Sequence, residues 1–363
     1  MNDDCLKLTI YCGERDRAGG MFLADALMEV FARHELQLSL VVRATSGFGL
    51  KHQLRSDRLL TLSEDLPLVC VAVDRRDRIQ TALDDIETLS FDGLVTLERA
   101  RMLTGQFEAV ELPQDLHEAT KLTVYVGRQE KAGSRPAHET VVDLLQRHGV
   151  AGATVLLGVD GTAHGVRQRG RFFARNAAVP LMVICVGDGE RIAAALPELG
   201  HMLARPLLTL ERVRVCKRDG QRLAQPDQLP DTDQSGQQLW QKLMVYASEQ
   251  SRYDGRPLYV ELVRRLRQAG AAGATSLRGI WGYHGDHQPH GDSFWQLRRR
   301  VPVLTVLVDS PANIHRWWAI VDEVTAHTGL VTSEIVPAFR ATTPHGQHGG
   351  LRLAQRRHER NAD

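Results

Sequence analysis

Three glycine-containing turns are the segments of this chain best suited to hold an anion. They contain Arg43, Gly47 and Gly49 in the first copy of a recurring pattern, Gly158 and Gly161 in the second, and Arg278, Gly279 and Gly282 in the third. A glycine lets the backbone approach a phosphate closely and direct N–H groups toward it. The same residues would also serve a tight turn with positive φ at a strand end, and the sequence leaves both interpretations open.

Basic side chains follow each of these turns. They are Arg55 and Arg58, Arg167 and Arg169, and Arg298. The guanidinium group suits phosphate because its planar fork binds two oxygens at once. A solvated loop would also carry arginines, but their recurrence after all three turns favours an anionic ligand or partner. The formal net charge of the whole chain is only +1, which argues against a broad nucleic-acid surface.

A cluster of histidines in the third copy is the second candidate site. His284, His287 and His290 stand close together, with Asp286 and Asp292 among them. Imidazole nitrogens at such spacing bind copper, zinc or nickel. A polar loop without any metal is the alternative, and the first two copies have no such cluster.

Enzyme chemistry finds little support in the sequence. No Ser-His-Asp or Cys-His set, no P-loop and no recurring pair of carboxylates can be placed, so we expect a non-enzymatic protein. The five cysteines are scattered, which suits a reducing compartment. The start, Met1-Asn-Asp-Asp4, and the lack of a long apolar run predict a cytoplasmic protein with neither signal peptide nor membrane span.

The elements that position these residues occur three times. Each copy has an opening strand that ends in tyrosine, then a proline that begins an apolar run, then a strand that ends in glutamate. The landmarks are Tyr11, Pro67 and Glu98; Tyr125, Pro180 and Glu211; and Tyr246, Pro302 and Glu334. We expect the glutamates to be structural, either bonding to a neighbouring copy or capping a strand.

Apolar spacing within each copy alternates in the strands and follows a helical period between them, which predicts the order βαββαβ. The predicted fold class is therefore α+β, with three tandem ferredoxin-like domains that form an intramolecular pseudo-trimer. Strands that are apolar on both faces need such a partner, although three independent domains are the alternative. The predicted boundaries are 5–103, 119–217 and 239–340 for the copies, 218–238 for a linker, and 341–363 for a disordered tail.

Several segments carry a resemblance to a known family. They are Arg43-Ala-Thr-Ser-Gly-Phe-Gly49 in the first copy, and Gly255-Arg-Pro-Leu-Tyr259, Ala272-Gly-Ala-Thr-Ser-Leu-Arg-Gly279 and Gly282-Tyr-His-Gly285 in the third. Together they resemble the uncharacterised PII-like family known as domain of unknown function 190. The resemblance covers all three copies.

The resemblance implies the fold of the PII nitrogen-signalling proteins, which bind adenine nucleotides in clefts between subunits and signal by moving the loop after the second strand. It also implies an association with small fluoride-efflux channels. Gly47-Phe48-Gly49 resembles the Gly-Phe-Gly that approaches the nucleotide in PII proteins. The basic loop that grips the phosphates is not matched, because only the second copy offers a cation there, Arg205.

We therefore expect a non-enzymatic PII-like regulator that senses a small anionic, nucleotide-like ligand between the copies. No cofactor is certain, and an adenine nucleotide is the candidate. The expected partner is a fluoride or other ion transporter, and the expected assembly is a monomeric pseudo-trimer. The alternative function is a metal-binding protein, similar to the copper-tolerance trimers, that uses His284, His287 and His290.

Overall fold

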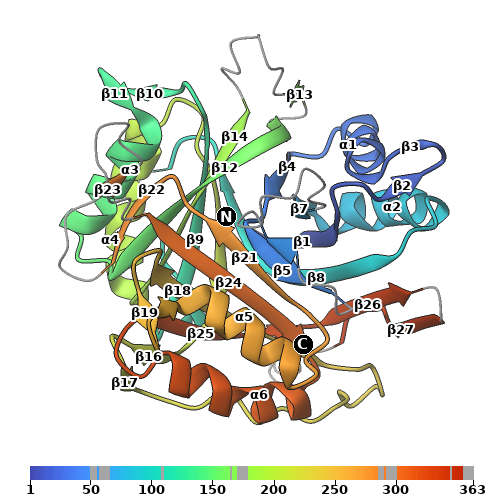
Figure 1. The fold of residues 1–363 in the computed structure, drawn as a ribbon. Coiled ribbons are helices and arrows are strands. Elements are labelled where there is room, and N and C mark those ends of the chain that lie inside the picture. Colours follow the sequence, from blue (N-terminus) through green and yellow to red (C-terminus); the bar gives the residue numbers. More distant parts are fainter. Residues whose placement is uncertain are drawn as a thin grey trace.

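The structure is a computed structural model that describes residues 1–49, 55–56, 66–107, 110–163, 166–169, 179–284, 290–291, 301–343 and 346–354. Each copy, called repeat 1, 2 or 3, has four main strands and two helices (Figure 1). In repeat 1 they are β1 (Asn2–Gly13), α1 (Leu23–Arg33), β4 (Leu38–Arg43), β7 (Pro67–Arg75), α2 (Arg76–Thr88) and β8 (Gly93–Thr104).

The other two repeats have the same order of elements. Repeat 2 has β9 (Thr120–Gly127), α3 (Ala137–Arg147), β12 (Gly152–Ala163), β14 (Pro180–Gly187), α4 (Gly189–Met202) and β15 (Leu207–Arg212). Repeat 3 has β18 (Trp240–Ser248), α5 (Leu258–Gln268), β21 (Ala274–Arg278), β24 (Pro302–Asp309), α6 (Pro311–Val324) and β25 (Leu330–Val336). Short hairpins β2–β3 (Arg17–Ala18, Met21–Phe22), β10–β11 (Lys131–Ala132, Arg135–Pro136) and β19–β20 (Arg252–Tyr253, Arg256–Pro257) precede the first helix of each repeat.

The helices form because their apolar residues recur at helical spacing. Leu27, Val30 and Phe31 line the buried side of α1, and the other helices bury a similar stripe. Two helix starts are capped by side chains: Asp188 accepts a hydrogen bond from the backbone N–H of Glu190, and Ser310 accepts one from that of Asn313. In each repeat both helices cover one side of the strands.

The segment after the second strand of each repeat pairs with another repeat. In repeat 1, β5 (Ser46–Phe48) pairs with β21 of repeat 3. In repeat 2, the second half of β12, residues 158–163, pairs with β4 of repeat 1. In repeat 3, β22 (Trp281–His284) pairs with the first half of β12 in repeat 2. All three repeats therefore exchange strands in one cyclic order.

The segment after the fourth strand makes a second exchange in the opposite cyclic sense. The end of β8 pairs with β15 of repeat 2, with Thr104 opposite Leu207. At the end of repeat 2, β16 (Arg214–Arg218) pairs with β25 of repeat 3. At the end of repeat 3, β26 (Ala338–Thr343) pairs with β8 of repeat 1. Two exchanged segments therefore join each pair of repeats.

These exchanges show that the predicted fold class is wrong. The chain does not contain three separate ferredoxin-like domains packed as a pseudo-trimer, because strands of repeats 1 and 2 form one closed, eight-stranded antiparallel sheet in the order β1-β7-β4-β12-β14-β9-β15-β8, with β8 returning to β1. The four main strands of repeat 3 lie in a second sheet, which also contains β5 of repeat 1 and β16. The prediction placed the exchanging segments in glycine turns or at the ends of the repeats, so it missed the hydrogen bonds that make the sheets continuous.

The two segments predicted to be irregular are also partly structured. The predicted linker, 218–238, contains one strand of the hairpin β16–β17, in which β17 is Gln221–Arg222. The predicted disordered tail contains β27 (Gly346–Gly350), which pairs with β26, and this hairpin adds to the edge of β8. Trp240 stacks on Phe339 with ring centroids 3.9 Å apart, which fixes the hairpin against repeat 3.

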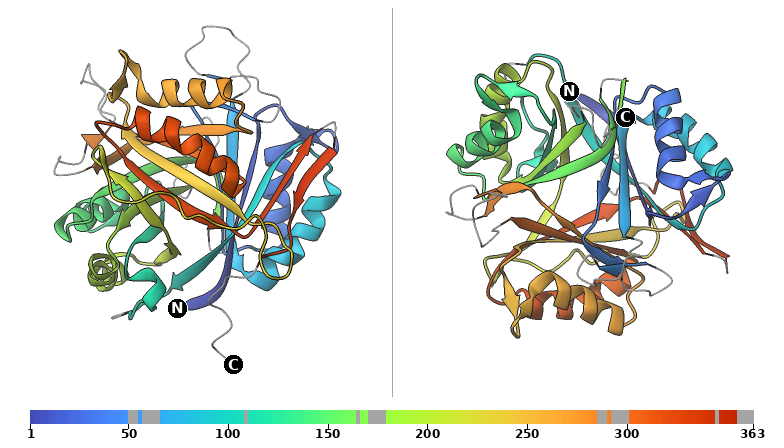
Figure 2. Two further views of the ribbon diagram at one scale, coloured as in Figure 1. Left: turned by 90° about the horizontal axis from the view of Figure 1, so that it is seen from below. Right: turned by 45° about the horizontal axis from the view of Figure 1, so that its top comes forward.

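Each repeat has its own apolar core beneath its helices, and a further core is built from all three repeats. The shared core contains Tyr125, Met182, Met244 and Val306. Figure 2 shows the three helix pairs at the periphery and the strands crossing between them. Among the described residues, no helix is long and apolar enough to cross a membrane.

Candidate functional site

The aligned glycines Gly47, Gly161 and Gly282 lie where strands cross between repeats. A Cβ atom added to Gly47 would lie 2.7 Å from the carbonyl oxygen of Ala274, and one added to Gly161 would lie 2.7 Å from that of Ser39. Gly282 makes the same close approach to the carbonyl oxygen of Ala153 and has φ +148°. In each case the oxygen belongs to the repeat that receives the strand. Close backbone packing therefore accounts for these three glycines, and their predicted contact with a ligand stays a prediction.

The remaining glycines divide into two kinds. Gly158 and Gly279 approach the carbonyl oxygens of Pro180 and Pro302 in their own repeats, so they too serve close strand packing. Gly49 is different, because an added Cβ would meet nothing within 4 Å. It is exposed and lines a cavity, which makes it the glycine of the predicted set with room for a ligand nearby.

The predicted arginines Arg43 and Arg278 both have carboxylate partners. Arg43 Nη2 lies 2.8 Å from Glu14 Oε2, and Arg278 Nη2 lies 2.9 Å from Glu249 Oε1. Each glutamate follows the opening strand of the same repeat. The two arginines therefore hold the end of the second strand to the end of the first.

The other predicted site residues are described only in part. Arg55 lies in β6 (Arg55–Ser56), where it pairs with Gly47, and Arg167 and Arg169 lie in β13 (Val166–Arg169). His284 ends β22, and His290 begins β23 (His290–Gly291). The side chains of these five residues lie outside the described part of the chain, as do Arg58, His287 and Arg298 entirely. The predicted loop contacts and the predicted metal site therefore stay predictions.

A ring of six buried charges joins the three repeats, and only half of it was singled out in the sequence. We call it the ionic ring; its members are Lys7, Glu211, Lys121, Glu334, Lys242 and Glu98, in the order in which they touch. Within each repeat the lysine of the opening strand stands directly opposite the glutamate of the closing strand. Each lysine also reaches the glutamate of another repeat.

The distances make the ring continuous. Lys7 Nζ lies 3.2 Å from Glu98 Oε2 and 2.6 Å from Glu211 Oε2. Lys121 Nζ lies 3.0 Å from Glu211 Oε2 and 2.5 Å from Glu334 Oε2. Lys242 Nζ lies 2.8 Å from Glu334 Oε2 and also contacts Glu98, which closes the ring. Every charge therefore has two opposite partners, as burial of six ions requires.

The ring perturbs the acid–base behaviour of its members. Burial alone would raise the pKa of the Glu98 carboxyl, but Lys242, Lys7 and Lys121 outweigh it and hold this pKa well below its usual range. The pKa of Glu334 is lowered by Lys121 and Lys242 in the same way. Burial lowers and carboxylates raise the pKa of Lys7, and the carboxylates prevail. Lys121 is the exception, because burial and the two other lysines leave its pKa lowered.

Among the described residues, Glu98, Glu211 and Glu334 are the acidic group close enough together to hold a metal, but the lysines already neutralise them. The expectation that these glutamates are structural agrees with this geometry. The lysines were missed, although the sequence carries a signal for them. A lysine recurs at the same position of all three opening strands, and a lysine that is buried there needs a carboxylate partner.

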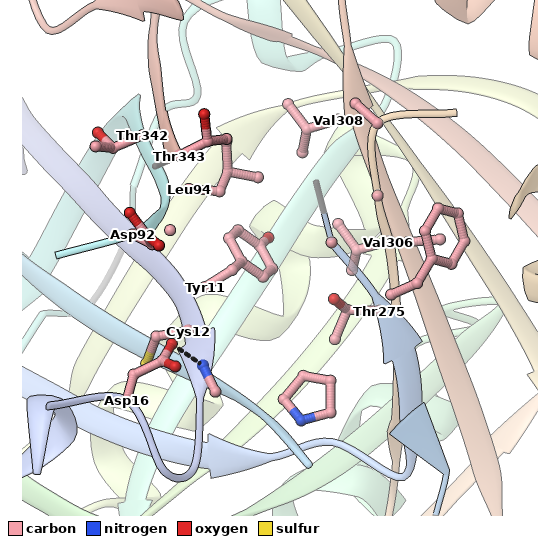
Figure 3. Close-up of a pocket in the computed structure, with 18 of the residues that line it drawn as sticks. Tyr11, Cys12, Asp16, Asp92, Leu94, Thr275, Val306, Val308, Thr342 and Thr343 are labelled. Carbon is pink, nitrogen blue, oxygen red and sulfur yellow. Dashed lines mark hydrogen bonds between the residues drawn. The ribbon is translucent and has the colours of Figure 1, made fainter. Parts of the chain in front are cut away.

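The Tyr11 cavity, of about 140 Å³, lies between repeats 1 and 3 (Figure 3). Repeat 1 supplies Tyr11, residues 92–94, Phe48 at the end of β5, and Gly49. Repeat 3 supplies residues 272–275, Val306, Val308 and the exchanged strand β26. The cavity therefore exists only because the two repeats exchange β5 and β26 on either side of it.

The lining of the Tyr11 cavity is mostly apolar and carries a few polar groups. Figure 3 shows Tyr11 between Asp92 and Leu94 on one side and Thr275 and Val306 on the other. Burial raises the pKa of the Tyr11 phenol to about 12, so it keeps its proton at neutral pH. The carboxylate of Asp16 also lines the cavity and accepts a hydrogen bond of 2.6 Å from the backbone N–H of Gly13.

The corresponding cleft between repeats 2 and 3 is much narrower. Its apolar pocket has a volume of about 30 Å³ and is lined by Tyr246, Tyr283 and Ile184, among others. Tyr283 stands at the position that Phe48 has in repeat 1, and its hydroxyl donates a hydrogen bond of 2.7 Å to the carbonyl oxygen of Val150. The clefts are therefore not equivalent, and the Tyr11 cavity is the larger of these two.

Comparison with known proteins finds one family and single-copy relatives. The profile of domain of unknown function 190, described as "Uncharacterized ACR", matches residues 5–102, 119–215 and 240–338. A UPF0166 protein of Aquifex aeolicus is 33% identical over 95 residues, which cover 26% of this chain and 88% of the relative. A UPF0166 protein of Methanocaldococcus jannaschii is 32% identical over 89 residues, which cover 24% of this chain and 82% of the relative.

Proposed function

Because this chain belongs to the family of domain of unknown function 190 and carries its domain three times, we propose that it is a non-enzymatic, PII-like regulatory protein of the cytoplasm. Its sensing site is the Tyr11 cavity, and its ligand is a small nucleotide-like molecule. The observation that carries the proposal is a ring-sized cavity between two repeats, bordered by Phe48 and Gly49 at the end of β5.

The size and lining of the Tyr11 cavity suit a flat heterocyclic ring. An apolar cavity of about 150 Å³ is known to accept benzene, and this one has a volume of about 140 Å³. Leu94, Val306 and Phe48 supply apolar contact area, and the hydroxyls of Tyr11 and Thr275 supply hydrogen bonds. Small-molecule sites commonly combine such a lining with a few polar groups that fix the orientation of the ligand.

The charges of the lining indicate which end of the ligand enters first. Among the described residues that line the Tyr11 cavity, Asp16 and Asp92 carry charge, and none is a lysine or arginine. Carboxylates accept hydrogen bonds from ring N–H groups and repel phosphate. A phosphate therefore extends outward, toward the loop that follows Gly49, where the sequence carries Arg55 and Arg58.

This orientation gives a route for regulation. The ligand touches Gly49, and the predicted loop after the second strand is the part of the sequence that carries Arg55 and Arg58. A phosphate bound by Arg55 and Arg58 would favour the arrangement of these residues that binds it more tightly. The loop is then the surface that a partner reads, and an ion transporter is the partner that the family resemblance favours.

Isothermal titration calorimetry on the full chain tests the proposal. Adenosine, AMP, ADP and ATP are the probes, and we expect the nucleotides to bind more tightly than adenosine. The double variant Arg55→Ala/Arg58→Ala should weaken binding of the nucleotides to the level of adenosine and leave adenosine unchanged.

A cavity-filling variant locates the site. Thr342 lines the Tyr11 cavity from β26, and Thr342→Trp should remove binding of adenosine and of nucleotides alike. Gln347 stands opposite Thr342 in the same hairpin and does not line the cavity, so Gln347→Trp is the matched control. Heat of binding that is absent for all four probes, or that survives Thr342→Trp, would refute the proposal.

A further inference from the structure

A second cavity, distinct from the Tyr11 cavity, lies on repeat 2 where its last strand passes to repeat 3. It has a volume of about 360 Å³, and three arginines line it, Arg191, Arg214 and Arg218. We call it the Arg218 cavity. Its lining is richer in polar atoms than that of the Tyr11 cavity, so the two cavities are suited to different ligands.

Strand exchange brings the three arginines together. Arg191 lies in the first turn of α4 in repeat 2. Arg214 and Arg218 lie at the two ends of β16, which leaves repeat 2 and pairs with β25 of repeat 3, Arg214 opposite Ser333 and Arg218 opposite Leu330. Both β16 arginines are exposed. Without the exchange, β16 would not stand across from α4, and the cavity would lose one wall.

The arginines are not all neutralised by the protein. Arg191 Nη1 donates a hydrogen bond of 2.5 Å to the carbonyl oxygen of Gly149, an uncharged acceptor. Arg214 Nη1 lies 2.6 Å from Asp227 Oδ1. The side chain of Arg218 is exposed and has neither an ion pair nor a hydrogen bond with any described residue.

Two carboxylates also line the Arg218 cavity. Asp188 caps α4, where its side chain accepts a hydrogen bond of 2.9 Å from the backbone N–H of Glu190. Glu118 is exposed. Asp227 already pairs with Arg214, so Arg191 and Arg218 are the two guanidinium groups of the lining that have no carboxylate partner among the described residues. These two arginines are the groups that can receive an anion.

We propose that the Arg218 cavity binds a small polyanion whose charge is carried by phosphate or carboxylate groups. Arginine forks bind both kinds of group through paired hydrogen bonds. A volume of about 360 Å³ lies within the range of small-molecule sites. Ala151 and Arg218 also line the narrow apolar pocket between repeats 2 and 3, which adjoins the Arg218 cavity. That pocket has room for about one water-sized group, so it cannot hold a large apolar part of the ligand, and the ligand is charged rather than largely apolar.

Calorimetry at low ionic strength tests this site on the full chain. The probes are pyrophosphate and citrate, which separate phosphate from carboxylate recognition. We expect one of them to bind with one site per chain, and Arg218→Ala to weaken that binding roughly ten- to hundred-fold, as expected for loss of a charge-assisted hydrogen bond. Arg218→Glu should abolish it.

The controls keep folding and the two cavities apart. Arg218 has no described partner, so its replacement should leave the melting temperature unchanged. Arg33, an exposed arginine of repeat 1, is the matched control, and Arg33→Ala should bind the probes normally. Thr342→Trp, which fills the Tyr11 cavity, should also leave this binding intact. Failure of both probes to bind, or binding that is equal in the wild type and in Arg218→Glu, would overturn the proposal.

Discussion

Removal of one lysine from the ionic ring should destabilise the whole chain. In Lys121→Met, Glu211 keeps Lys7 as its partner and Glu334 keeps Lys242, but the ring then holds two positive and three negative charges in a buried site. Leaving an uncompensated buried charge costs about 3–5 kcal/mol. Because the pKa of Lys121 is lowered, its charged form is the least stabilised of the three ring lysines. We therefore expect Lys121→Met to lower the free energy of unfolding by about 3 kcal/mol.

A second substitution should recover part of this loss. Glu334→Gln in the Lys121→Met background restores equal numbers of positive and negative charges in the ring. The free energy of unfolding, measured by denaturant titration, should therefore be lower for Lys121→Met than for the double variant. The coupling energy in the double-mutant cycle should exceed about 1 kcal/mol. A loss below about 1 kcal/mol for Lys121→Met, or additive effects in the cycle, would refute the view that the ring is electrically balanced.

Three further predictions concern the fold. The pKa values of Glu98 and Glu334 are lowered in the folded state, so their contribution to stability is complete above the unfolded pKa of about 4.3. This contribution is lost as the pH falls from that value through the folded pKa values, and measurement of the unfolding free energy against pH would show the loss. Gly47→Ala should lower the free energy of unfolding by about 1–3 kcal/mol, because the added Cβ meets the carbonyl oxygen of Ala274. Gly49→Ala should change it by less than about 0.5 kcal/mol, since an added Cβ there meets nothing. Equal effects of the two variants in thermal melts would contradict the close strand crossing at Gly47. Burial raises the pKa values of Cys5, Cys185 and Cys216 to about 12, so a thiol reagent should label these cysteines in the native chain far more slowly than in the unfolded one, and rapid native labelling would count against their burial.

The order of elements could be predicted from the sequence because local signals fix it. Proline begins β7, β14 and β24, alternation marks the opening strands, and helical spacing marks α1 to α6. Three tandem copies of one family domain were predicted and are confirmed by the profile match. Each of these inferences depends on residues that are close together in the chain.

Pairing between repeats could not be predicted in the same way. Residues 101–104, 158–163 and 214–218 carry no periodicity that names their partner strand, since the hydrogen bonds run between backbone groups. The sequence therefore indicated separate domains where the structure has continuous sheets. The glycines gave a partial signal, because Gly47, Gly161 and Gly282 recur where the backbone must pass close to another repeat.

Whether the candidate site residues contact a ligand stays a prediction. The turn at Gly49 does border a cavity between repeats, but the described lining contains carboxylates and no arginine. The Arg218 cavity was not foreseen, because β16 lies at the junction of repeat 2 and the predicted linker. Its arginines converge only after that strand has paired with repeat 3.

Methyl-resolved NMR of the full chain during titration with AMP and ATP tests the central claim most directly, namely that a nucleotide-like ligand binds between repeats 1 and 3. The methyl groups of Leu94, Val306 and Val308 line the Tyr11 cavity, and those of Val124 and Val155 lie in the core of repeat 2. The account predicts that the first three shift with saturation at one ligand per chain, while the other two stay in place. Unchanged signals from Leu94, Val306 and Val308 in an excess of both nucleotides would contradict it.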